Sequence, residues 1–342
     1  MPIVNAPEKF TANGDVEAEK LLGNVLLEIR EALSGTDLWV VLGGSYARGE
    51  GGVRTEREKG LLFNDLDLFV FAEKKVPDGE TILKALAEKY HKILHIDVDF
   101  SRIMPPSVLR KDGRRLMMQE LKRNYVLVAG KDLIAEYLPE LPAEKIPFEE
   151  AFRLLLNRGM GLFFAAEKMA ENSDDGDFIL RNIYKAVLGA GDAILIRNHR
   201  YCWKIAERSA VINSLDIAEE WKALYQQAIC YKRTPHGHLT AGTAELHRKA
   251  VAFLKGAVFA CAGTADVNDL PSALYEKCRE NGETSWTNLV RYCIKSRSVV
   301  FSVRYSAPAV TIVLADLMKI LTQEGVPSAC KERLLKLWRL FN

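Results

Sequence analysis

The sequence has no long apolar run and no apolar stretch of signal-peptide length near its first residue. A membrane-spanning helix needs about 20 mostly apolar residues, and even the apolar segment "AVTIVLADLMKIL" is interrupted by Asp316. A secretory signal would place its apolar region among the N-terminal residues. We therefore expect a cytoplasmic protein that has no membrane partner.

An excess of charge of one sign is also absent. The chain contains 47 Lys and Arg residues against 45 Asp and Glu residues, which gives a net charge of +2. A groove for long nucleic acid would make its domain strongly basic, so we expect no such partner. A local basic patch can still hold a small anion, and the function has to be sought in local motifs.

Paired cysteines are the third absence. All six cysteines lie in the second half of the sequence, and none forms a CxxC pair. This spacing argues against a zinc site. It predicts reduced and mostly buried thiols, as in cytosolic proteins.

The sequence does contain two regions of different pattern, and its 342 residues are enough for two hydrophobic cores. Apolar residues at helical spacing predict helices over 16–33 and 79–92. β-prone runs occur at 37–42, 64–72, 92–103 and 125–130. After the prolines at 139, 142 and 147, only helical patterns follow. We therefore predict a mixed α+β domain over residues 1–145 and an all-helical domain over residues 146–342.

Two pairs of acidic residues lie within the β-prone runs. Asp65 and Asp67 in "NDLDLF" are two residues apart, so on a strand their side chains point to the same face. Neighbouring carboxylates repel each other unless a cation neutralises them, and a divalent metal is the natural cation. Asp97 and Asp99 in "HIDVDF" repeat this spacing and predict a further carboxylate for the same metal cluster. Alternation alone does not choose between Asp97 and Asp99.

A glycine-serine turn precedes the first acidic pair. In "VVLGGSYARG", Gly43 and Gly44 allow a sharp turn with exposed N–H groups, and Ser45 adds a hydroxyl. Such a turn favours a phosphate group. Arg48 either contacts that phosphate or pairs with a nearby acid such as Glu50. Together, the turn and the acidic strands predict metal-assisted phosphoryl or nucleotidyl transfer.

In this order, "GGSYARG", "NDLDLF" and "HIDVDF" resemble the nucleotidyltransferase superfamily of DNA polymerase β, over roughly residues 16 to 130. The chain looks most like the small bacterial branch that includes antibiotic adenylyltransferases. The resemblance implies a small mixed sheet flanked by helices, followed by a helical domain that completes the nucleotide and acceptor cleft. It also implies transfer of a nucleoside monophosphate, AMP from ATP by expectation, to a hydroxyl of a small-molecule acceptor with release of pyrophosphate.

The resemblance also assigns roles to individual residues. Asp65 and Asp67 would coordinate two Mg²⁺ ions, and Asp97 would bind the ion that activates the acceptor, with Asp99 as the alternative. Gly43, Gly44 and Ser45 would hold the β- and γ-phosphates. In the helical half, Lys185 and Arg208 would contact the triphosphate, whereas the competing interpretation makes this basic cluster a solvated face.

One departure from the family pattern and two alternative functions accompany this resemblance. The segment "EGGVRTEREKGLLF", which separates the turn from the acidic pair, is longer than the usual connection in similar proteins, and its charged tip suggests a lid. A catalytically inactive nucleotide-binding regulator of the same fold is one alternative function. Transfer to a protein side chain is the other. Intact Asp65, Asp67 and Asp97 favour an enzyme.

Overall fold

The computed structural model describes residues 5–300, 302–323 and 325–341. The chain divides into two compact units. Unit 1 comprises residues up to Pro142 together with the short segments 203–205 and 229–236, and unit 2 comprises the rest. The sequence predicts a single boundary near residue 145. It does not predict that two segments from the second half of the chain join unit 1.

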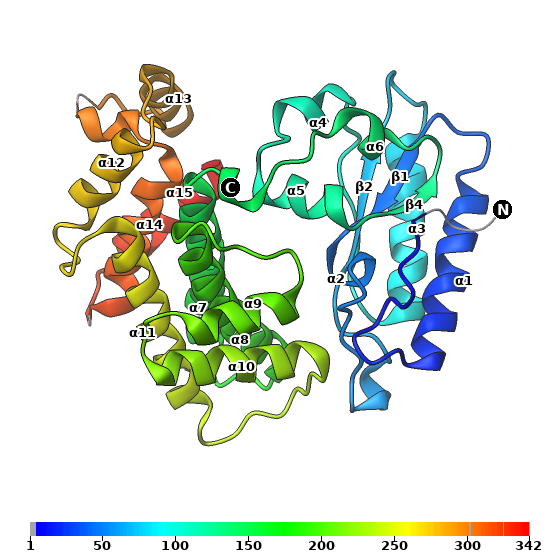
Figure 1. Cartoon of the computed structure of the whole chain (residues 1–342), viewed down its shortest axis with the longest axis horizontal. Helices are drawn as coiled ribbons and strands as arrows, with labels where there is room; N and C mark the ends of the chain where they lie inside the picture. The colour runs from blue at the N-terminus through cyan, green and yellow to red at the C-terminus, as the bar shows by residue number, and fades with distance from the viewer. Residues whose placement is uncertain (1–4, 301, 324, 342) are drawn as a thin grey trace. The chain divides into compact units, whose positions relative to one another are not determined.

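A four-stranded mixed sheet forms the centre of unit 1 in the described residues (Figure 1). Its strands are β1 (Trp39–Leu42), β2 (Leu66–Phe71), β3 (Val98–Phe100) and β4 (Val126–Ala129). They lie in the order β3-β2-β1-β4. β1 pairs antiparallel with both β2 and β4, whereas β2 and β3 are parallel.

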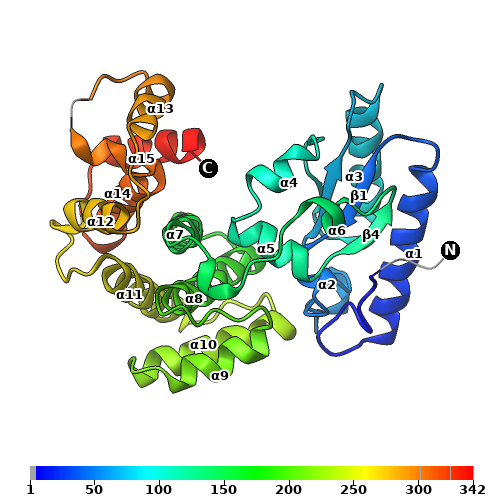
Figure 2. The ribbon, with the colours of Figure 1, turned by 45° about the horizontal axis from the view of Figure 1, so that its top comes forward.

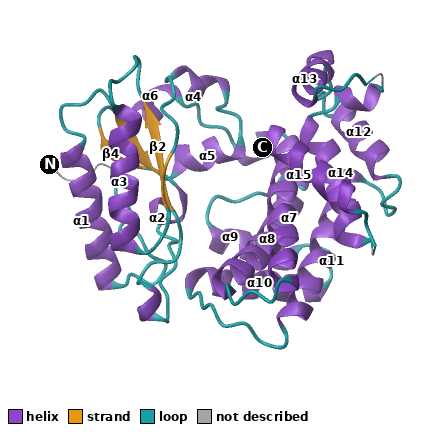
Figure 3. Ribbon diagram, turned by 180° about the vertical axis from the view of Figure 1, so that it is seen from behind, coloured by secondary structure: helices purple, strands orange, loops and turns teal. Residues whose placement is uncertain are grey.

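Helices cover both faces of this sheet, which explains why β1 is apolar at every position. Val40 and Leu42 belong to one core cluster, whereas Trp39 and Val41 belong to another. The first cluster includes residues of α1 (Val16–Ala32) and α3 (Gly79–Leu94), which lie together against one face of the sheet (Figure 3). The second cluster includes residues of α4 (Ser107–Lys111), α5 (Leu116–Arg123) and α6 (Leu133–Tyr137). Unit 1 also contains α2 (Gly44–Ala47) and the 3₁₀ helix η1 (Arg57–Lys59).

Unit 2 contains helices and loops but no strand in its described residues. Its longest helices, α7 (Glu149–Ala170) and α8 (Gly176–Arg197), pack against each other (Figure 2). The chain then forms α9 (Ile205–Ser214), α10 (Glu219–Arg233), α11 (Thr243–Ala262), α12 (Leu270–Glu280), α13 (Trp286–Ser296), α14 (Ala309–Thr322) and α15 (Ser328–Phe341). The 3₁₀ helices η2 (Ala143–Lys145) and η3 (Val303–Ser306) complete it. The start of α9 and the end of α10 fall in the segments that join unit 1.

The coarse sequence predictions are confirmed: the protein is mixed α+β with a small mixed sheet, and helices alone follow residue 148 in the described part of the chain. No helix among the described residues is long and apolar enough to cross a membrane. The six cysteines are all free, as expected, but the prediction that most are buried is wrong. Only Cys261 and Cys278 are buried, and Cys230 and Cys330 are exposed.

Candidate active site

The glycine-serine turn follows β1 directly and lies against β2. Leu42, the last residue of β1, is opposite Leu68, and the next residue, Gly43, donates its N–H to the Asp67 carbonyl at 2.8 Å. Antiparallel pairing therefore brings the turn next to the acidic pair. The Gly43 N–H, which the sequence analysis expects to be exposed for a phosphate, is engaged in this bond. A Cβ at Gly43 would lie 2.7 Å from the Phe69 ring, so the residue also has a packing role.

Gly44 brings the turn into contact with the Asp67 carboxylate. Its φ angle is +70°, in the left-handed region that favours glycine. A Cβ at this position would overlap with Oδ2 of Asp67. The carboxylate therefore lies over the bare backbone of the turn, and no other residue type leaves room for it.

Two residues that the sequence analysis did not single out hold the turn and the acidic strand together. Tyr46 is fully buried, and its hydroxyl accepts the N–H groups of Phe63 and Asn64, both at 3.2 Å. Asn64 Oδ1 in turn accepts the Gly52 N–H at 2.7 Å. Burial raises the pKa of Tyr46 well above its usual range, and the nearby charge of Asp65 adds to this rise. Tyr46 therefore stays a neutral acceptor that fixes the backbone just before Asp65.

The acidic residues of β2 and β3 share one face of the sheet. In the parallel register, Leu66 is opposite Val98 and Asp67 is opposite Asp99. Leu66 and Val98 point into the core that α1 and α3 cover, so the aspartates on either side of them point to the other face. Asp67 is half-buried and Asp99 is exposed.

Asp97 lies earlier on the same strand face but has a different environment. Its carbonyl accepts the Leu66 N–H at 2.9 Å, so its backbone extends the sheet. Its side chain is 65% exposed, and its Oδ1 lies 3.7 Å from Nδ1 of His91. The register therefore sets Asp99, not Asp97, directly beside Asp67. Which of the two binds a metal stays a prediction.

The donor chemistry of this face suits a hard divalent cation, because carboxylate oxygens are the protein ligands that Mg²⁺ prefers. The described residues contain no group of three or more His, Cys, Asp or Glu side chains already gathered as a metal site.

An ion-pair cluster lies beside the turn and includes Arg48. Its guanidinium pairs with Glu50 at 3.3 Å and with Glu120 at 3.6 Å. Glu50 also pairs with Lys232 at 2.8 Å and accepts the Ile205 N–H at 2.9 Å. Arg48 thus has the acidic partner that the sequence suggests, and a phosphate contact for it stays a prediction.

The charge state of Glu50 follows from these partners. Burial by itself would raise the pKa of Glu50, but the charges of Lys232 and Arg48 overcome this effect and hold it at about 2. Glu50 is therefore ionised at neutral pH. It fastens the segments 203–205 and 229–236 to unit 1.

The long connection between the turn and the acidic pair is held together by internal bonds, and a lid function for its charged tip stays a prediction. Arg54 is buried and donates Nε–H to the Leu62 carbonyl at 3.0 Å, and its N–H donates to the Leu61 carbonyl at the same distance. Glu56 is also buried and pairs with Lys59. These bonds close the connection on itself.

The two basic residues predicted in the helical half lie in unit 2. Arg208 is only 5% exposed, and its guanidinium pairs with Asp192 Oδ2 at 2.6 Å. Asp192 is also buried, and its Oδ1 accepts the Tyr225 hydroxyl at 2.7 Å. Arg208 is therefore part of a buried polar cluster and not of a solvated face. Lys185 is half-buried on α8, and triphosphate contacts for both residues stay predictions.

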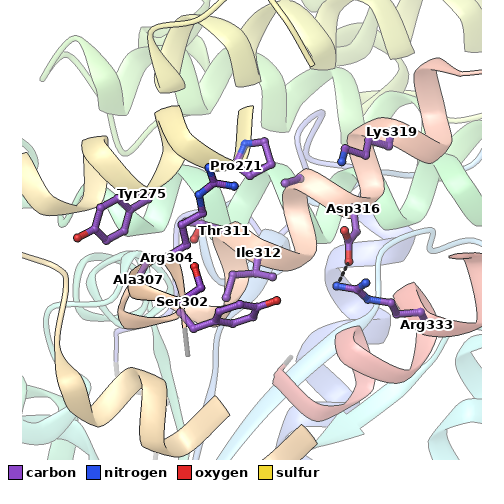
Figure 4. Close-up of a pocket in the computed structure, with 12 residues that line it drawn as sticks. Pro271, Tyr275, Ser302, Arg304, Ala307, Thr311, Ile312, Asp316, Lys319 and Arg333 are labelled. Carbon is purple, nitrogen blue, oxygen red and sulfur yellow. Dashed lines mark ion pairs between the residues drawn. The ribbon is translucent and has the colours of Figure 1, made fainter. Parts of the chain in front are cut away.

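A pocket of about 400 Å³ lies elsewhere in unit 2, between α12, η3, α14 and α15 (Figure 4). Asp316 and Arg333, which both line it, form an ion pair at 3.3 Å. None of the site residues predicted from the sequence lines this pocket. No protein-family model, curated protein or solved structure matches the chain.

Proposed function

We propose that the protein is a Mg²⁺-dependent nucleotidyltransferase of the DNA polymerase β-like superfamily. It would transfer AMP from ATP to a hydroxyl group of a small-molecule acceptor and release pyrophosphate. One observation carries the proposal: the Asp67 carboxylate lies over the backbone of Gly44 in the turn and opposite Asp99 on the next strand. This arrangement places carboxylates next to a turn of the kind that holds phosphate oxygens.

Asp65, Asp67 and Asp99 are the residues that would hold the metal. When bound, Mg²⁺ neutralises triphosphate charge and makes the acceptor oxygen a better nucleophile. Asp99 is preferred to Asp97 because the register sets it beside Asp67, whereas Asp97 lies near His91. This choice departs from the one that the family resemblance suggests.

The turn supplies the phosphate contacts in this proposal. The N–H groups of Gly44 and Ser45 begin a helical turn and have no intrahelical acceptor. With the Ser45 hydroxyl, they are the donors proposed to bind phosphate oxygens, whereas the Gly43 N–H is already bonded to Asp67. Tyr46 and Asn64 keep the turn at a fixed distance from the acids.

The reaction balances as an in-line displacement. The acceptor oxygen forms a bond to the α-phosphorus, the bond from that phosphorus to the bridging oxygen of pyrophosphate breaks, and the hydroxyl proton passes to a carboxylate on the acidic face. Asp99 is the candidate for this proton acceptor, because it lies opposite Asp67 and is the more exposed of the two.

The test combines nucleotide binding with label transfer. The protein is first screened with each of the four nucleoside triphosphates for Mg²⁺-dependent thermal stabilisation. It is then incubated with α-labelled nucleotide and a fractionated metabolite extract, and transfer of label and release of pyrophosphate are measured. We expect ATP to stabilise the protein and to donate label, and Asp67→Asn to abolish transfer.

Asp97→Asn and Asp99→Asn form a matched pair for the third acid, since both change an exposed aspartate on one face of the same segment. We expect Asp99→Asn to abolish transfer and Asp97→Asn to retain it. Binding of ATP without transfer to any fraction, and without an effect of Asp67→Asn, would indicate the inactive regulator. Absence of Mg²⁺-dependent binding of every triphosphate would contradict both functions.

A further inference from the structure

Helix α13 carries an apolar row on its exposed side. Trp286, Val290 and Ile294 are spaced by four residues, so they lie one above the other on one helix face. Trp286 and Ile294 are 73% and 72% exposed. Tyr292 and Ser296 are buried and pack the opposite side of the helix into unit 2. Figure 1 shows α13 at an edge of this unit, where it contacts η3 and α15.

The segment that follows the helix carries two more exposed apolar side chains. Val299 is 78% exposed, and Val303 at the start of η3 is also exposed. Half of the large apolar side chains that are exposed in the described part of the chain therefore lie within the 18 residues 286–303. A concentration of this kind on a folded surface indicates an interaction site.

The segment that carries these apolar residues has only positive charges. Residues 284–315 contain no Asp or Glu but include Arg291, Lys295, Arg297 and Arg304. Arg291 and Lys295 are exposed and four residues apart, and they form a cationic row next to the apolar one. Lys295 Nζ also donates to the Leu340 carbonyl at 3.0 Å, which ties one end of this row to α15. This segment thus combines exposed apolar and cationic side chains and contains no acid of its own.

We propose that this face of α13 binds an anionic lipid surface. A helix with one apolar row, a neighbouring row of Arg and Lys and an aromatic residue has the composition of interfacial amphipathic helices, and a Trp ring suits the boundary between headgroups and acyl chains. The cations complement the negative charge of acidic lipids. Peripheral binding of this kind needs neither a membrane-spanning helix nor a signal segment, whose absence led to the expectation that the protein has no membrane partner.

A second copy of the chain is a poorer occupant of this face. A two-fold interface brings the same patch of both subunits together, so the cations of two α13 helices would share one interface, and α13 itself supplies no acid to pair with them. The repulsion would oppose association. An acidic protein partner would need a groove that fits a convex helix, whereas a lipid headgroup layer adapts to it.

The experiment measures sedimentation of the full chain with vesicles of phosphatidylcholine alone and with vesicles that contain about 30% phosphatidylglycerol. This share of anionic lipid gives the vesicle surface roughly the negative charge that attracts polybasic segments. We expect binding to the anionic vesicles only, reduced by added salt. Trp286→Ser/Ile294→Ser and Arg291→Gln/Arg297→Gln should each weaken this binding about tenfold or more.

Control variants test whether the effect is specific to α13. Val16→Ser removes an apolar residue that is 82% exposed on α1, and Lys84→Gln removes an exposed cation on α3. Both should bind as the wild type does, and circular dichroism should be unchanged in all variants because every substituted side chain is exposed.

Four results would overturn the proposal. Equal binding to neutral and anionic vesicles would remove the role of the cations, and unchanged binding of the Trp286→Ser/Ile294→Ser variant would remove the role of the apolar row. Concentration-dependent dimerisation that these substitutions abolish, without vesicle binding by the wild type, would assign the face to a second copy. Absence of vesicle binding with a monomeric chain would leave a protein partner as the occupant.

Discussion

The buried pair between Arg208 and Asp192 gives the sharpest stability prediction, because the sequence suggested a phosphate contact for Arg208. At an effective dielectric constant of about 20, two unit charges 2.6 Å apart attract each other by about 6 kcal/mol. Desolvation offsets part of this energy when the pair forms. When Arg208 alone is removed, the Asp192 charge stays buried beside the Tyr225 hydroxyl without its cation.

Arg208→Met should therefore lower the free energy of unfolding of unit 2 by about 3–5 kcal/mol, the usual cost of breaking a buried pair from one side. The double variant Arg208→Met/Asp192→Asn should be less destabilised than the sum of the two single changes, because the second substitution removes the uncompensated charge. Arg279→Met, which breaks an exposed pair with Glu276 in the same unit, should cost at most about 1 kcal/mol.

Urea titration followed by hydrogen–deuterium exchange of peptides from α8 and α9 measures opening of this part of the chain alone. A cost below about 1 kcal/mol for Arg208→Met, or strictly additive effects in the double variant, would refute the structural role of Arg208. If Arg208→Met folded with unchanged stability and lost ATP binding, the triphosphate role expected from the resemblance would be favoured instead.

Three further predictions concern single residues. Gly44→Ala should destabilise unit 1 by at least about 1 kcal/mol in urea unfolding and displace the Asp67 carboxylate that a Cβ would meet; a neutral effect would contradict the contact. Because partners lower the pKa of Glu50 to about 2, its stabilisation is complete above its usual value near 4.5 and is lost as pH falls toward 2. Glu50→Gln should thus lower the free energy of unfolding by about 3 kcal/mol at pH 7 and should flatten the acid side of the curve of unfolding free energy against pH. An unchanged curve would disprove the pairing of Glu50 with Lys232 and Arg48. Burial, and after it the charge of Glu149, raises the pKa of Glu283 to about 7, so the wild type should lose stability as pH rises from about 4.5 to 7. Glu283→Gln should remove this loss and should be more stable than the wild type at pH 8. A variant that is less stable than the wild type at pH 8 would contradict the raised pKa.

The main elements of unit 1 could be predicted from periodicity, because short-range patterns determine them. The helix predicted at 16–33 is α1, and the run predicted at 64–72 contains β2. The strand predicted at 92–103 is reduced to β3, since α3 continues to Leu94 and only three residues, 98–100, form the strand.

The contacts that organise the candidate site depend on pairing across the sequence, which no local pattern reveals. Alternation places Asp97 and Asp99 on the same face, and only the register with β2 sets Asp99 beside Asp67. Glu50 and Lys232 are 182 residues apart, and their pairing depends on which segments of the second half join unit 1. Tyr46 was part of the quoted turn motif, but its role follows only from the two N–H groups that its hydroxyl accepts.

The most direct test of the nucleotidyltransferase account is a crystal structure with Mn²⁺ and a non-hydrolysable ATP analogue, in which anomalous scattering locates the ion. We expect Mn²⁺ between the carboxylates of Asp65 and Asp67, with Asp99 turned toward it and the analogue's phosphates on the N–H groups of Gly44 and Ser45. A nucleotide bound away from this turn, or Mn²⁺ held by residues outside the acidic face of β2 and β3, would contradict it.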